Sequence, residues 1–176
     1  MAKSPKRKEY LKDYKLDNEG KYRYSGKSYK FDGTEQERRK VYRDLLILAV
    51  ILLVPIAASG FTDAPCAIRA FYVIIPFIGE VSSYFALVWY LSKLMFEGRS
   101  IRGYIFETAN NRIPPACQIL MFFAILGLAA SLLYIAFNGF EGEVFKDFLY
   151  ISFKACDGIL AFCFKKYYNR VNWVVL

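Results

Sequence analysis

Four long apolar runs constrain the fold of this chain more than any other feature. They cover about residues 45–61, 69–94, 114–137 and 145–164 of the 176. A helix needs about 17–25 predominantly apolar residues to cross the hydrocarbon core of a bilayer. We therefore predict an all-α integral membrane protein in which residues 44–166 form a four-transmembrane-helix bundle.

The distribution of Lys and Arg predicts how this bundle is oriented. The chain has 24 of these residues and a net charge of +8, and most of them lie in residues 1–43, in the loop at 95–113 or after the last apolar run. Short loops rich in Lys and Arg stay in the cytoplasm. We therefore predict a multi-pass protein of the cell membrane with residues 1–43 and a tail at 167–176 both in the cytoplasm. The partners we expect for these basic segments are anionic lipids of the bilayer, not nucleic acid.

The basic head at 1–43 contains two segments with strand periodicity. Residues 21–24 and 28–31 alternate polar and aromatic side chains and are separated by turn residues, so they predict a short β-hairpin or meander. The alternative is a flexible tail, because an isolated hairpin is marginal in water. Thr34 and Glu37 form a capping-box pattern that predicts the start of a helix continuous with the first span. Pro114 and Pro115 are expected to open the third span, where proline is tolerated.

Several kinds of chemistry are disfavoured by what the sequence lacks. It has no His, and its four Cys residues form no C-x-x-C pair, so we expect no metal site and no redox motif. There is no phosphate-binding loop, nucleotide fingerprint or nucleophile elbow. We therefore predict a protein that is not an enzyme and has no cofactor.

Three charged residues interrupt the apolar runs. Glu80 lies about ten residues into the second run, and Lys154 and Asp157 lie about seven and ten residues into the fourth. At ~1.5 Å rise per residue, these positions fall in one layer near the middle of the membrane. Lys154 and Asp157 are three residues apart and share a helix face. Ser83 and Tyr84 are the polar residues expected beside Glu80.

A charge at the centre of a span costs at least about 2.5–3.5 kcal/mol, so the layer must face the bundle interior. One interpretation is a proton or ion relay in which Glu80 or Asp157 binds the cation. A second is a structural ion pair between Lys154 and one of the two acids. A third is that a charge docks a separate membrane subunit. Two acids and one base leave one acid that must be protonated, hydrated or paired with a partner, and this odd acid argues against a purely structural layer.

Small residues predict where helices approach one another closely. Gly127 and Ser131 form a small-xxx-small pair in the third span, and Gly158 extends the face of Lys154 and Asp157. The expected function is a small transporter, channel or ion-coupled membrane component. The alternative is a non-catalytic membrane interaction or scaffold subunit that recruits a cytoplasmic partner through residues 1–43. Either protein is expected to associate with a second copy or with a membrane partner subunit.

Overall fold

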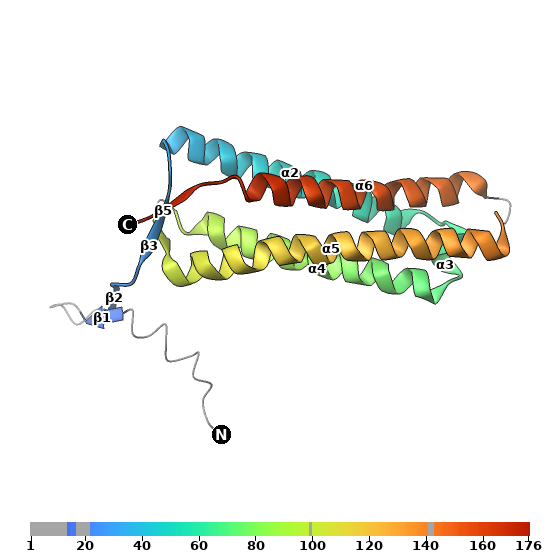
Figure 1. Ribbon diagram of the computed structural model, residues 1–176, viewed down its shortest axis with the longest axis horizontal. Helices are drawn as coiled ribbons and strands as arrows, with labels where there is room; N and C mark the ends of the chain where they lie inside the picture. Colours follow the sequence, from blue (N-terminus) through green and yellow to red (C-terminus); the bar gives the residue numbers. More distant parts are fainter. Residues whose placement is uncertain (1–13, 17–21, 99, 141–142) are drawn as a thin grey trace, which may run out of the picture.

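The computed structural model describes residues 14–16, 22–98, 100–140 and 143–176, and these residues are mostly helical. Four long helices lie side by side in an elongated bundle (Figure 1). They are α2 (Glu35–Phe61), α4 (Phe71–Phe96), α5 (Gly103–Asn138) and α6 (Val144–Tyr168). The short helix α3 (Pro65–Ile68) lies at one end of the bundle, which we call the α3 end, and the strands lie at the opposite end, which we call the sheet end (Figure 1).

The surface of the bundle is apolar and several charges are inside it. Val54, Ile75, Phe85, Ile125 and Ile159, from all four long helices, are each more than half exposed. Helices α2, α4 and α5 are long and apolar enough to cross a membrane. Helix α6 differs because it carries charges at its middle and at both ends.

The strands form two small sheets. Strand β1 (Tyr14–Leu16) pairs with β2 (Tyr22–Tyr24), and β3 (Ser28–Phe31) lies between β4 (Ile101–Arg102) and β5 (Trp173–Val175). All of these pairings are antiparallel. Strand β5 comes from the predicted tail, so the chain segments before α2 and after α6 meet at the sheet end (Figure 1).

The predicted hairpin between residues 21–24 and 28–31 is wrong in its pairing. The two segments are strands, but they belong to different sheets. Strand β3 pairs with β4 and β5, which come from distant parts of the chain. Next to β3, the N–H of Gly103 donates to the carbonyl of Lys27 at 2.8 Å. The ring of Tyr29 also stacks on Phe106 of α5 at a centroid distance of 4.1 Å. Pairing at both edges and packing on the bundle therefore hold β3 in place.

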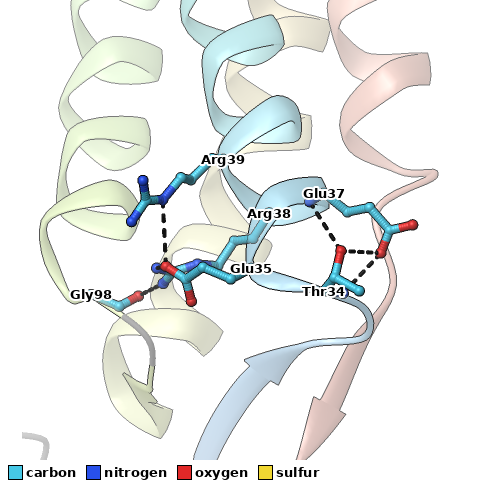
Figure 2. A network of polar contacts seen from close by, with 6 residues as sticks. All are labelled: Thr34, Glu35, Glu37, Arg38, Arg39 and Gly98. Carbon is cyan, nitrogen blue, oxygen red and sulfur yellow. Dashed lines mark hydrogen bonds and ion pairs between the residues drawn. The ribbon is translucent and has the colours of Figure 1, made fainter.

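The start of α2 confirms the predicted capping box. The Thr34 hydroxyl accepts a hydrogen bond from the N–H of Glu37, and the Glu37 carboxylate accepts one from the N–H of Thr34 at 2.8 Å (Figure 2). These bonds satisfy two N–H groups that would otherwise lack partners. The hydrogen bonds that the N–H and hydroxyl of Thr34 donate to the Glu37 carboxylate lower the pKa of Glu37. Arg38 pairs with Glu35 and donates to the carbonyl of Gly98, which ties α2 to the residues that follow α4.

Helix α5 begins earlier than predicted. The two prolines at 114 and 115 lie inside it, because the helix starts at Gly103. A proline within a helix leaves the carbonyl four residues earlier without its donor. Here those carbonyls belong to Asn110 and Asn111, which are both exposed and can be solvated. The interruption is therefore tolerated, and the region predicted as a loop is mostly helix.

Candidate functional site

The middle of the bundle contains an ion pair with no exposed surface. Glu80 lies near the middle of α4 and Lys154 near the middle of α6. The Lys154 ammonium donates to Glu80 Oε2, and both side chains are 0% exposed. The structure therefore brings together two of the three charges that the sequence placed in one layer.

Two aromatic rings enclose the Lys154 ammonium. Its Nζ lies 4.7 Å from the ring centroid of Phe77, which is on α4, and 5.2 Å from that of Tyr150, which is one turn earlier on α6. A desolvated ammonium is attracted to the faces of such rings. Glu80 has a second oxygen, Oε1, that receives no hydrogen bond. The pair is thus held by one charged contact and two ring contacts.

The third charged residue of the layer stands apart from this pair. Asp157 has no exposed surface, and neither of its carboxylate oxygens has a hydrogen-bond partner among the described residues. Lys154, three residues earlier on the same helix, forms its ion pair with Glu80 instead. The odd acid expected from the sequence is therefore Asp157. Buried polar groups without partners are rare in folded proteins and call for an explanation.

The small residues of the site lie where α5 meets the ion pair. A Cβ added to Gly127 would lie 3.6 Å from Glu80 Oε1 and 3.6 Å from Lys154 Cδ. Ser131, which is fully buried, donates to the carbonyl of Gly127 at 2.8 Å. Gly158 faces Ala124 of the same helix α5, with 3.8 Å between a built Cβ and the alanine methyl. Helix α5 therefore completes the wall around the pair.

Ser83 and Tyr84, the two polar residues expected beside Glu80, form their hydrogen bonds with backbone carbonyls. Ser83 donates to the carbonyl of Gly79 at 2.7 Å within α4. The Tyr84 hydroxyl donates to the carbonyl of Ala49 at 3.1 Å and so joins α4 to α2. Both residues are buried close to the layer, but neither one bonds to Glu80, Lys154 or Asp157 among the interactions described.

Sequence reasoning missed a fourth buried charge. Asp147 lies on α6 near the α3 end and has no exposed surface. Its Oδ1 accepts the N–H of Cys66 at 3.1 Å, while its Oδ2 has no partner among the described residues. The signal was its spacing, because Lys154 and Asp157 follow Asp147 by seven and ten residues and share one helix face with it. The sequence analysis gave Asp147 no role, although it lies within the fourth apolar run, close to its edge.

The Asp147 carboxylate also acts on the thiol of Cys66. Burial raises the pKa of this thiol to about 12, and a hydrogen bond to Asp147 adds to the rise. The nearby hydroxyl of Ser131 acts on the pKa of this thiol in the opposite direction and more weakly. Cys66 is therefore a neutral, buried hydrogen-bonding group between α6 and α5.

The close packing of α4 on α5 beside Glu80 leads to a stability prediction. A Cβ at Gly79 would lie 2.6 Å from three atoms of the Phe123 ring. We expect Gly79→Ala to lower the free energy of unfolding by about 1–3 kcal/mol, because the ring must move. Gly158→Ala is the matched control and should have a much smaller effect, since its Cβ meets only the Ala124 methyl at ordinary contact distance. Thermal unfolding in detergent measures both, and equal midpoints would contradict the packing argument.

No protein-family model, curated protein or solved structure matches this chain at a significant level. Among the described residues, no group of three or more His, Cys, Asp and Glu side chains is arranged to hold a metal ion. The function is therefore argued from the geometry of the buried charges.

Proposed function

We propose that this protein is a small transporter, channel or ion-coupled membrane component that binds and releases a proton or a small monovalent cation at Asp157. The observation that carries this proposal is that neither Asp157 oxygen has a hydrogen-bond partner among the described residues, although the side chain is fully buried. Glu80 and Lys154 neutralise each other, so Asp157 is not needed to balance their charge. An acid that stays buried without a partner opposes folding, and such acids in membrane helices mark ion and proton pathways.

The proposal includes four membrane spans, with α6 as the fourth. The charges at the middle of α6 are 1% and 0% exposed, so none of them contacts lipid. The exposed face of the same helix carries Phe148, Ile159 and Phe162. A helix with this division crosses a bilayer only as part of a bundle, because its partners provide the polar contacts. Four spans place the segments before α2 and after α6 on one side, which the excess of basic residues assigns to the cytoplasm.

A hydrophobic carbodiimide tests Asp157 directly. A protonated carboxyl group adds across one C=N bond of dicyclohexylcarbodiimide, its proton passes to nitrogen, and the adduct rearranges to a stable acylurea with no leaving group. We expect mass spectrometry of the purified protein in detergent to find an adduct on Asp157. The carboxylate of Glu80 should react much more slowly, because its Oε2 is engaged by the Lys154 ammonium.

The controls separate a proton from a metal cation. Asp157→Asn should abolish the adduct, and Asp157→Glu should restore it. If the ligand is Na⁺, then Na⁺ but not choline should protect Asp157 from modification; if it is a proton, both salts should leave the rate unchanged. Folded protein that shows no adduct on Asp157 at any pH would contradict the proposed function.

A second candidate function is favoured by the charges at the sheet end. Lys27, Lys30, Arg39, Lys40 and Arg43 are exposed there. Such a surface suits a non-catalytic subunit that holds a cytoplasmic partner or anionic lipid, since each basic residue contributes about 1 kcal/mol near an anionic surface. Recruitment should fail when these residues are replaced by Gln and survive Asp157→Asn, whereas ion movement should show the reverse.

A further inference from the structure

The buried acid Asp147 has no role in the site as described so far. Among the described residues, its buried Oδ2 has no hydrogen-bond partner, and neither do the two oxygens of Asp157. Glu143, which caps α6, and Lys146 in the first turn of α6 are about half exposed and pair with each other at the rim. Asp147 is therefore a buried carboxyl group one residue beyond an exposed ion pair at the α3 end.

Polar groups extend from Asp147 toward the buried layer. Its carboxylate accepts the N–H of Cys66, and Cys66 packs in one cluster with Ala130, the residue of α5 next to Ser131. Ser131 is one turn from Gly127, whose carbonyl accepts its hydrogen bond and whose Cα lies against Glu80 and Lys154.

Tyr150 provides a second connection to the layer. It packs in the same cluster as Cys66 and places its ring 5.2 Å from the Lys154 ammonium. Both routes come from the α3 end of the bundle.

The sheet half of the bundle has the opposite character. The described residues that are buried between the layer and the sheet end are mainly aliphatic or aromatic, and they include Leu45, Leu87, Leu91 and Phe164. Phe164 lies two turns beyond Asp157 on the same face of α6 and has no exposed surface. Among the described residues, the buried Ser, Asp, Glu and Lys side chains all lie in the α3 half or at the middle. The sheet half is mainly apolar, and its buried polar atoms include the Tyr168 hydroxyl, one turn beyond Phe164. A proton therefore meets a buried carboxyl group on the α3 side of the layer and mainly apolar side chains on the other.

We propose that Asp147 is a relay acid through which protons from the α3 end reach the layer that contains Asp157. This inference rests on the proposed function, because it assumes that Asp157 takes up a proton. The titratable groups around this acid are Cys66 from α3, which bonds to Asp147, and Tyr134 from α5 and Tyr150 from α6, which pack with Cys66. Asp63, Arg69 and the Glu143–Lys146 pair are nearer the surface. None of these removes the need for Asp147, since it is the only carboxylic acid that is buried between the rim and the layer among the described residues.

The direction of access is measured on the full-length protein in liposomes with a pH gradient. A protease added outside removes an N-terminal affinity tag only from molecules whose sheet end faces outward, so mass spectrometry distinguishes the two orientations in one sample. The outside buffer is acidic, the lumen is alkaline, and dicyclohexylcarbodiimide reports protonated Asp157. We expect modification of Asp157 in molecules that keep the tag, whose α3 end faces the acid. Modification mainly in molecules that lose the tag would overturn the proposal.

Substitution of Asp147 tests the relay itself. Asp147→Asn keeps an oxygen that can accept the Cys66 N–H, but the amide cannot take up and release a proton as a carboxyl group does. We therefore expect Asp157 to be modified from the α3 side at least about tenfold more slowly. Asp147→Glu should restore the rate. If Asp147 has only a structural role, Asp157 should be modified at the wild-type rate in Asp147→Asn, and that result would overturn the proposal. The orientation experiment uses the unaltered chain, so it decides the question even if Asp147→Asn does not fold.

The failure of this inference is distinguishable from failure of the proposed function. If Asp157 is never modified in detergent, the proposed function fails. If Asp157 is modified in detergent but shows no preference for the α3 side in liposomes, or no dependence on Asp147, only the relay fails.

Discussion

Replacing Lys154 by Met is expected to lower the free energy of unfolding by about 3–5 kcal/mol. The substitution keeps the length of the side chain but removes the cation that pairs with Glu80. Glu80 then stays fully buried without a partner for either oxygen, and the contacts of the ammonium with Phe77 and Tyr150 are lost as well. Unfolding by sodium dodecyl sulfate in mixed micelles measures the loss.

The control for this prediction is on the same helix. Lys166 is exposed near the end of α6, so Lys166→Met should change stability by at most about 0.5 kcal/mol. The double variant Lys154→Met with Glu80→Gln removes both charges and should recover much of the loss, because an uncharged pair is cheaper to bury than a single charge. If the losses in unfolding free energy of the two single variants simply add in the double variant, the contact between Lys154 and Glu80 does not stabilise the bundle.

The layer of charges was largely predictable from the sequence. Hydrophobicity gives the approximate position of each long helix, and a rise of ~1.5 Å per residue converts position into depth. Glu80, Lys154 and Asp157 were therefore assigned to one level before the helices were assembled. The choice of Glu80 over Asp157 as the partner of Lys154 was not predictable, since it depends on how α4 and α6 are rotated about their axes, and a periodic pattern of apolar residues leaves that rotation free.

Other features of the fold could not be predicted from the sequence, for physical reasons. The partners of β3 are two and three residues long and lie about 70 and 145 positions away, so no local pattern reveals them. Helix α5 continues through Pro114 and Pro115 because exposed carbonyls tolerate the loss of a donor. Asp147 was missed because a charge at the edge of an apolar run is usually solvated, whereas here it is buried and bonds to Cys66 of α3.

Amide substitution at the two acids of the layer should give different results. Glu80→Gln is expected to destabilise the protein by about 3–5 kcal/mol, because it leaves the Lys154 ammonium buried without its counter-charge. Asp157→Asn is expected to change stability by at most about 0.5 kcal/mol, because it removes no ion pair and an amide has nearly the shape of a protonated carboxyl group. The two changes are chemically matched and lie in the same layer, so each one is the control for the other.

The comparison separates a structural acid from a functional one. Folding accounts for Glu80, because its charge holds α4 to α6 through Lys154. If Asp157→Asn is neutral in stability and abolishes the carbodiimide adduct, then folding does not account for Asp157, and its carboxyl group is present for what it binds. If Asp157→Asn instead destabilises the bundle as much as Glu80→Gln does, Asp157 shares the charge of Lys154. The layer is then a three-residue structural network, and the basic surface at the sheet end becomes the better place to look for function.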